Sequence, residues 1–382
     1  MKASFIISEF NLLHRGHLRL FSACRERVPD GAIVAVMSGS TVQRGELAVQ
    51  SKYVRAEAAV RCGADLVLEL PAPWSCSGAE FFAGAGTRLA ASFAAACGAE
   101  GYLCFGSESG DTARLRSIAE LLGKPEYLAR LSDERTKKSD RSESDIRTRD
   151  RVLRELYGIA LPTYANDILG VEYLRAIDRY SLGLTPITVR RGGEESATRT
   201  RAALLRRDIR ELSHICPAEM TDLLGAVPDM SRLYPLIAER FLYSPLPAGE
   251  IDGLSADLYY RIRDKVLQCK DYEELISSVT TKKYTCARVR RVILHTILGA
   301  DAGTLAASPG FTVVLAAGGR GKALLAERRR SGGELAVLTS SGGDADGVPG
   351  ISLLRRADEL WSLSVGEVPA ALRKKHPYIS DC

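Results

Sequence analysis

The feature that most constrains the fold is the alternation of short apolar runs with amphipathic stretches over the first hundred residues. Apolar runs typical of strands occupy residues 3–7, 32–37, 66–70 and 101–105, and stretches with helical spacing occupy 18–28, 53–62 and 79–96. This alternation predicts an α/β domain with a Rossmann-like parallel sheet covered by helices. Ligands of such sheets bind beyond the carboxyl ends of the strands, so we expect the chemistry to follow Ile7.

The rest of the chain predicts two further parts. A helical pattern at 168–177 and a short strand at 186–189 extend the α/β domain to residues 1–210. Residues 211–300 predict a mainly helical domain, and residues 301–382 return to alternation, which predicts a small C-terminal α/β segment. Residues 133–151 are strongly charged without an apolar face, which favours a solvated loop leading into the next helix.

The composition excludes several classes of protein. With 46% hydrophobic and 26% charged residues, the 382-residue chain is neither disordered nor collagen-like. No apolar run approaches about 18 residues and no signal peptide begins the chain, so we expect a cytoplasmic protein without a membrane partner. The nine cysteines form no CxxC pair, so no zinc site, other metal site or disulfide framework is predicted. A net charge of +5 favours a polyanionic partner only weakly.

Two histidines flank a glycine where the first strand gives way to the first helix. His14, Gly16 and His17 follow the apolar run and precede the helical pattern. A glycine there allows phosphate oxygens to approach the backbone, and the helix N-terminus adds free N–H donors and partial positive charge. Imidazoles at this place can stabilise charge that develops on a phosphoryl group. A histidine is more often structural, but this position favours a catalytic role.

A second motif, Ser196, Thr198 and Arg201, lies near the end of the α/β domain. Hydroxyls and a guanidinium suit the binding of β- and γ-phosphates and of departing pyrophosphate. The alternative is a helix N-cap beside an ordinary exposed arginine. The H-x-G-H and S-x-T-x-x-R pair resembles the nucleotidyltransferase superfamily, which implies a HUP-type Rossmann-like fold and attack at the α-phosphate of a nucleotide.

Further segments carry a narrower resemblance. They are MSGSTVQRGELA at 37–48, GADLVLELP at 63–71, FGSE at 105–108, NDILGVEYL at 166–174 and TKKYTCAR at 281–288, with Lys52, Arg55, Arg290 and Arg291 between and after them. In these segments, which span nearly the whole chain, the sequence resembles the tRNA(Met) cytidine acetate ligase family. The resemblance implies that ATP and acetate form acetyl-adenylate, and that acetyl then passes to N4 of the wobble cytidine of elongator tRNA(Met). It implies tRNA rather than DNA as partner, and Mg²⁺ is expected with the triphosphate.

The resemblance also implies an ATP site. Its residues are Ile7, Ser8, Glu9, Phe10, Asn11, His14, Gly16, His17, Leu20, Gly106, Asn166, Ser196, Thr198 and either Arg190 or Arg191, between which the sequence does not choose. We expect His14, His17 and Arg201 to be catalytic. The alternatives are a strand-end turn for Gly106 and an N-cap for Asn166.

Basic residues outside this set are candidates for contacts to acetate, triphosphate or tRNA. Gln43, Arg44, Lys52 and Arg55 follow the second predicted strand, and solvent-facing charge is the equal alternative. Lys282, Lys283, Tyr284, Arg288, Arg290 and Arg291 combine cations with an aromatic ring, as RNA-binding surfaces do, whereas a solvated helix face is the plain alternative.

Three positions depart from the family pattern, and they bear on the acyl substrate and the tRNA more than on the ATP chemistry. Leu12 replaces a proline, which predicts a looser loop, Arg15 is expected to add a cation beside the phosphates, and Thr41 replaces an aromatic residue. The alternatives are an adenylyl- or cytidylyltransferase acting on a small phosphorylated metabolite, and an RNA-binding protein without turnover. The sequence does not indicate an oligomeric state.

Overall fold

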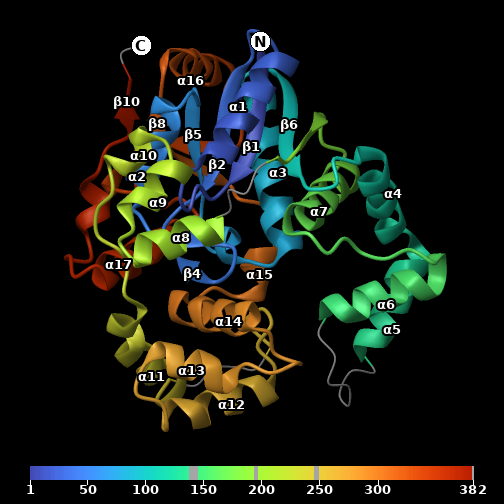
Figure 1. Ribbon diagram of the computed structural model, residues 1–382, viewed down its shortest axis with the longest axis vertical. Coiled ribbons are helices and arrows are strands. Elements are labelled where there is room, and N and C mark those ends of the chain that lie inside the picture. The colour runs from blue at the N-terminus through green and yellow to red at the C-terminus, as the bar shows by residue number, and fades with distance from the viewer. Residues whose placement is uncertain (137–144, 193–196, 245–248, 381–382) are drawn as a thin grey trace.

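A computed structural model describes residues 1–136, 145–192, 197–244 and 249–380 of the chain (Figure 1). Two predictions fall outside these ranges, namely Ser196 and the middle of the charged segment 133–151. The residues described form one large mixed sheet, with helices on both of its faces and a helical segment beside its carboxyl edge.

Five parallel strands form the centre of the sheet in the order β5-β2-β1-β6-β7. Their bounds are β1 Lys2–Ser8, β2 Ala32–Ser38, β5 Leu66–Leu70, β6 Glu100–Ser107 and β7 Leu184–Arg190. Strands β2 and β5 are buried along their whole length, which explains why their residues are almost all apolar rather than alternately apolar and polar, with Glu69 as the one charged exception. The predicted parallel α/β sheet is confirmed.

The order of the strands defines where a ligand site can form. From β1 the chain moves outward through β2 and β5, then returns to place β6 on the other side of β1. Such a reversal leaves a crevice beyond the carboxyl end of the central strand. Helices that connect and cover these strands are α1 Arg15–Arg27, α2 Lys52–Arg61, α3 Ala79–Ala96, α4 Thr112–Gly123 and α7 Ala165–Arg179.

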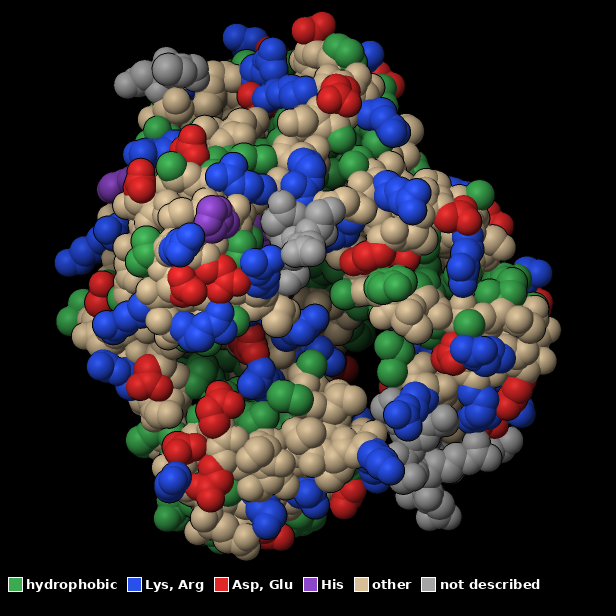
Figure 2. Space-filling view, viewed as in Figure 1, with side chains coloured by type: hydrophobic (Ala, Val, Ile, Leu, Met, Phe, Trp, Pro, Cys, Tyr) green, Lys and Arg blue, Asp and Glu red, His purple; other side chains and the backbone are tan. Residues whose placement is uncertain are grey.

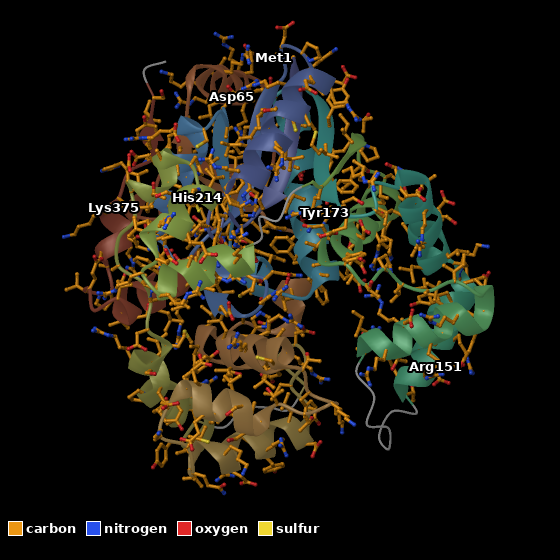
Figure 3. All side chains as sticks on the ribbon, in the orientation of Figure 1. Met1, Asp65, Arg151, Tyr173, His214 and Lys375 are labelled. Atoms are coloured by element: carbon orange, nitrogen blue, oxygen red, sulfur yellow. The ribbon has the colours of Figure 1, made fainter. Side chains whose placement is uncertain are left out.

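Both described ends of the charged segment expected as a loop are helical. Helix α5 (Pro125–Thr136) and helix α6 (Asp145–Tyr157) cover its two ends and pack on one another as an arm beside the sheet (Figure 1). The loop prediction was wrong at these two ends because the apolar residues that the helices bury, Leu131, Val152 and Leu153, lie just outside the charged run 133–151. Arg151, labelled in Figure 3, forms an ion pair with Glu134 at 2.7 Å between the two helices.

The helical part expected at 211–300 is confirmed as helical. Its main helices are α9 Ile209–Ile215, α11 Tyr234–Leu242, α12 Ala256–Val266, α13 Tyr272–Val279 and α14 Cys286–Leu298. Buried residues of α11 to α14 belong to the same apolar cluster as residues of β1 and β2, so this part shares the core of the sheet.

The C-terminal segment is α/β, as predicted, but it does not form a sheet of its own. Strand β8 (Phe311–Ala317) pairs antiparallel with β5, and β9 (Ala336–Leu338) and β10 (Tyr378–Ile379) pair with β8. The exposed edge of β5 explains this addition, because an unpaired apolar strand needs a neighbour. Helix α17 (Ile351–Ser364) then returns across the molecule to the β3–β4 hairpin, Thr41–Val42 and Glu46–Leu47.

Among the residues that the structure describes, no helix is long and apolar enough to cross a membrane. Eight of the cysteines are described, and each is a free thiol.

Candidate active site

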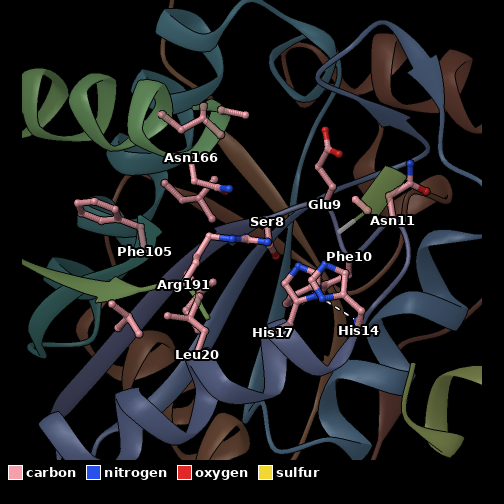
Figure 4. A pocket seen from close by; sticks show the side chains of 18 of the residues that line it. Ser8, Glu9, Phe10, Asn11, His14, His17, Leu20, Phe105, Asn166 and Arg191 are labelled. Carbon is pink, nitrogen blue, oxygen red and sulfur yellow. Dashed lines mark hydrogen bonds between the residues drawn. The ribbon is translucent and has the colours of Figure 1, made fainter. Parts of the chain in front are cut away.

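A cavity of about 420 Å³ opens at the crevice beyond β1 and β6 (Figure 4). Its walls come from the end of β1, the start of α1, the tip of the β3–β4 hairpin, the end of β6, and helices α7 and α8 (Ala197–Leu205). The predicted ATP-site residues that the structure describes all line it: Ile7, Ser8, Glu9, Phe10, Asn11, His14, Gly16, His17, Leu20, Gly106, Asn166, Arg190, Arg191 and Thr198. Arg201, Gln43 and Arg44 line it as well.

The two histidines form a stacked pair at the first turn of α1. His14 is the N-cap residue, with extended backbone, and its N–H donates to Nδ1 of His17 at 3.1 Å. The rings stack with centroids 3.8 Å apart, and Phe10 meets His17 edge-on at 5.0 Å. Gly16 makes this possible, because a Cβ there would lie 2.9 Å from the His14 ring. The glycine thus serves the histidine pair directly.

His17 is neutral in this setting. Burial lowers its pKa well below 6.5, and the nearby His14 and Arg191 lower it further. Since Nδ1 accepts the His14 N–H, the proton of the neutral ring belongs on Nε2. His17 therefore offers an N–H donor rather than a cation.

Glu9 faces the same cavity from the side opposite His17, where the hairpin tip lies (Figure 4). Burial raises its pKa, while the Gln43 N–H at 2.7 Å and the guanidinium of Arg201 act in the other direction. The carboxyl is therefore held by the tip of the hairpin.

Arg190 and Arg191 both line the cavity, but their side chains lie in different places. The side chain of Arg191 lies over Gly106, where a Cβ would be 3.1 Å from its Cγ, and it extends toward Ser8 and the histidines (Figure 4). Arg190 is exposed and packs against Gly110 instead. The geometry favours Arg191 as the cation at the centre of the cavity.

Asn166 is not an N-cap, since Tyr164 caps α7. Its amide donates to Glu108 at 2.5 Å, and Glu108 also lies 3.9 Å from Arg191. Gly106 lies within β6, so the simple turn alternative does not hold. These residues form a connected polar wall.

Helix α8 presents Thr198 and Arg201 of the second motif to the cavity. Thr198 and Arg201 are three residues apart and share one helical face, and Arg201 donates to the Asn11 carbonyl at 3.3 Å. Arg199, between them, turns away and pairs with Glu211 at 2.8 Å.

Two predicted contacts to substrate are corrected, because Lys52 and Arg55 are fully buried outside the cavity. Lys52 pairs with Glu69 at 2.8 Å and with Asp358 at 2.7 Å. Burial alone would lower its pKa, but the two carboxylates raise it above the ordinary value. Neither RNA contact nor the solvent-facing alternative holds for it.

Arg55 instead joins two backbone segments. Its guanidinium donates to the carbonyls of Glu9 and Gly39 and, at 3.0 Å, to that of Ser38. Burial lowers its pKa to about 10. The cation fixes the ends of β1 and β2 from inside.

The basic segment 282–291 is divided between surface and interior. Lys282 is exposed, Lys283 pairs with Asp257 at 3.2 Å, and Arg288 donates to the Gly253 carbonyl at 2.8 Å. Tyr284 is buried, and its hydroxyl donates to the Asp257 carboxylate. The prediction that its ring stacks on an RNA base was therefore wrong. Arg290 and Arg291 turn toward the hairpin.

Two expectations about the loop after β1 are also corrected. Arg15 is exposed and donates to the carbonyl of His214 on α9 at 3.0 Å, away from the cavity (Figure 3). Leu12 is fully buried and Asn11 accepts the Val49 N–H at 2.8 Å, so the loop is anchored rather than loosened.

Sequence reasoning missed several lining residues. Glu108 directly follows β6, and this strand-end position could have identified it. Leu169 and Tyr173 share a face of α7 with Asn166, at helical spacing. Phe82 and Phe105 carry no such signal, because buried aromatic residues are typical of any core.

A cavity at the strand reversal, a histidine pair at a helix N-terminus and two arginines facing it define a nucleotide-binding α/β enzyme. Residues 1–372 match the family described as HIGH Nucleotidyl Transferase, and the chain belongs to it. Within this class it belongs to the tRNA(Met) cytidine acetate ligase family, since relatives so named cover most of the chain.

One relative, from Syntrophotalea carbinolica, is 31% identical over 86% of this chain and 83% of its own. Another, from Acetivibrio thermocellus, is 30% identical over 89% of each chain. The crystal structure of Thermotoga maritima TmcAL bound with alpha-thio ATP is similar with a TM-score of 0.84, at 25% identity over 99% of both chains. Its apo form gives a TM-score of 0.85.

Proposed function

We propose that this chain is an ATP-dependent tRNA(Met) cytidine acetate ligase that activates acetate as acetyl-adenylate. The observation that carries the proposal is the stacked His14–His17 pair at the start of α1, facing Arg191 and Arg201 across one cavity. Membership of a ligase family supports the same conclusion.

In the first step an acetate oxygen attacks the α-phosphorus of ATP, and the bond to pyrophosphate breaks. We propose that Nε2–H of His17 and the ring of His14 stabilise charge on the α-phosphate, while Arg201 and Thr198 hold the departing pyrophosphate. Arg191, Gly106 and Asn166 bind the adenosine side.

In the second step the N4 amine of the wobble cytidine attacks the acetyl carbonyl, and AMP leaves. The tRNA surface we propose includes Arg44 at the rim of the cavity and the outward part of the basic segment, Lys282, Lys283 and Arg288. Figure 2 shows the surface hollowed between the segment α11–α14 and the α5–α6 arm, with Lys and Arg side chains on its rim. An RNA hairpin loop can enter such a hollow, where cations meet its phosphates.

Mg²⁺ is proposed to arrive with ATP. Within the described ranges, no group of three or more His, Cys, Asp or Glu side chains could hold a metal ion, and Glu9 and Glu108 are the carboxylates that line the cavity. This donor set fits an ion held chiefly by phosphate oxygens and water. Bound there, the ion would neutralise charge on the triphosphate.

The test is to incubate the protein with ATP, Mg²⁺, radiolabelled acetate and bulk tRNA, and to digest the RNA to nucleosides. We expect label in N4-acetylcytidine, and its loss in His17→Ala. Pyrophosphate release that depends on a phosphorylated metabolite instead of acetate would favour the nucleotidyltransferase alternative. Absence of any adenylate formation would favour RNA binding without turnover.

A second measurement separates the two halves of the reaction. Joint neutralisation of Lys282, Lys283 and Arg288 should weaken tRNA binding and flatten its dependence on salt, while acetate-dependent ATP–pyrophosphate exchange stays near that of the unaltered enzyme. His17→Ala should have the opposite pattern. Equal loss of both activities in either variant would contradict this division.

A further inference from the structure

The tip of the β3–β4 hairpin lies between helix α14 and the cavity. Gln43 and Arg44 at the tip line the cavity. Gly45, next to them, has φ +76°, and a Cβ there would lie 2.3 Å from the backbone nitrogen of Arg291. The tip is therefore pressed against the backbone of α14, with its side chains directed at the cavity.

Two arginines of α14 hold this tip. Arg290 forms an ion pair with Glu46, with both side chains about three-quarters buried. Arg291 donates to the Gln43 carbonyl at 3.5 Å. On its other side, the Gln43 N–H donates to the Glu9 carboxylate at 2.7 Å. A chain of contacts thus runs from α14 through the hairpin to a side chain that faces the cavity.

The base of the hairpin is held by other groups. Thr41 and Ser75 share a hydrogen bond of 2.7 Å, and the indole N–H of Trp361 donates to the Ala48 carbonyl at 2.7 Å. Loss of an α14 arginine leaves these contacts in place. Such a variant should therefore release the tip without unfolding the hairpin.

We propose that Arg290 and Arg291 are positioning residues that hold the hairpin tip, so that Arg44 and Glu9 face the cavity, and that they do not contact RNA. Arg44 brings a cation to the cavity wall, and Glu9 brings a carboxyl to the side of the cavity opposite Asn166 (Figure 4). A wall displaced by about 1 Å misaligns the anionic reactants and slows adenylate formation. The consequence for catalysis rests on the proposed function, whereas the mechanical role does not.

Hydrogen–deuterium exchange tests the mechanical role without reference to activity. In Arg290→Ala and in Glu46→Ala, the amides of Gln43 to Glu46 should exchange about tenfold faster, while those of α1 stay unchanged. Gly45→Ala should do the same without altering any charge. The control is Arg263→Ala, an exposed arginine on α12 of the same helical segment.

Kinetics then test the consequence. In ATP–pyrophosphate exchange without tRNA, Arg290→Ala should lower kcat/KM for acetate about tenfold, while Kd for an ATP analogue changes less than about twofold. The double variant Glu46→Ala/Arg290→Ala should lose no more than either single variant, because both act through one contact.

Unchanged protection of the hairpin tip in all three variants would overturn the proposal. So would an Arg290→Ala enzyme that keeps both acetate-dependent exchange and the protection of the hairpin tip but loses tRNA binding, since Arg290 would then be an RNA contact. If the unaltered enzyme shows no acetate-dependent exchange, the proposed function fails, and the exchange of the amides still decides the mechanical role.

Discussion

Gly16 is required by a side chain rather than by its own backbone. It lies in the first turn of α1, where alanine is favoured over glycine by up to about 1 kcal/mol. In Gly16→Ala the new Cβ would meet the His14 ring at 2.9 Å and displace it from His17. We expect thermal stability to be unchanged or raised, and acetate-dependent exchange to fall about ten- to a hundredfold.

The matched control for Gly16→Ala is Gly123→Ala. Gly123 ends helix α4, and a Cβ there would meet nothing within 4 Å. The control should gain stability and keep full activity. A Gly16→Ala enzyme with the activity of the control would show that the position of the His14 ring does not matter.

His295 on α14 makes stability depend on pH. Its Nε2 lies 3.0 Å from the Cys76 carbonyl, its Nδ1 has no hydrogen-bond partner in the described part of the chain, and burial lowers its pKa to about 4. Between pH 6.5 and 4 the unfolded state therefore binds the proton and the folded state does not, so stability is lost as the pH falls below 6.5. Between pH 7 and 5 we expect this group to cost about 2 kcal/mol.

The measurement is urea unfolding at pH 7 and at pH 5 for the unaltered protein and for His295→Gln. The stability of the unaltered protein should fall by about 2 kcal/mol more than that of the variant. Parallel losses in the two proteins would mean that His295 is protonated in the folded state.

At the scale of elements, a buried ion pair network joins α2, β5 and α17. Lys52, Glu69 and Asp358 meet with side chains at most 2% exposed, and Asp358 also accepts from Ser40 at 2.6 Å. Lys52→Met would leave two carboxyl groups buried without their cation. We expect a loss of about 3–5 kcal/mol in the free energy of unfolding, with tRNA affinity of the folded fraction unchanged.

Replacing all three groups in Lys52→Met/Glu69→Gln/Asp358→Asn should recover much of this stability, because no buried charge is left unpaired. Chemical denaturation of both variants measures the difference. A Lys52→Met protein that keeps full stability but binds tRNA more weakly would support the prediction from sequence that Lys52 contacts tRNA.

The site could be predicted from sequence where residues follow strand ends. His14 and His17 were identified because they lie in the loop and first helical turn after a buried strand, and Thr198 and Arg201 because they resemble the second nucleotidyltransferase motif. Lys52 and Arg55 could not be placed, since their partners, Asp358 and the carbonyls of distant loops, are far away in sequence. A cation in a basic sequence segment looks the same whether it faces water or a buried carboxylate.

At the scale of the whole molecule, apolar runs predicted the strands but not their order. Residues 301–382 were correctly expected to form an α/β segment, yet nothing local shows that β8 would pair antiparallel with β5. Pairing depends on which edge remains open after the parallel strands assemble. The segment that looked like an addition is therefore part of the central sheet.

This arrangement predicts the effect of removing residues 301–382. The deletion would expose the apolar edge of β5, and it would take away Asp358 and Trp361, which anchor α17 to Lys52 and Ala48. We expect the shortened chain to lose cooperative thermal unfolding and to aggregate, because an open apolar edge pairs with other chains. Circular dichroism during heating, with the full chain as reference, measures this. A shortened chain that unfolds cooperatively and still binds an ATP analogue would show that residues 1–300 fold independently of the C-terminal segment.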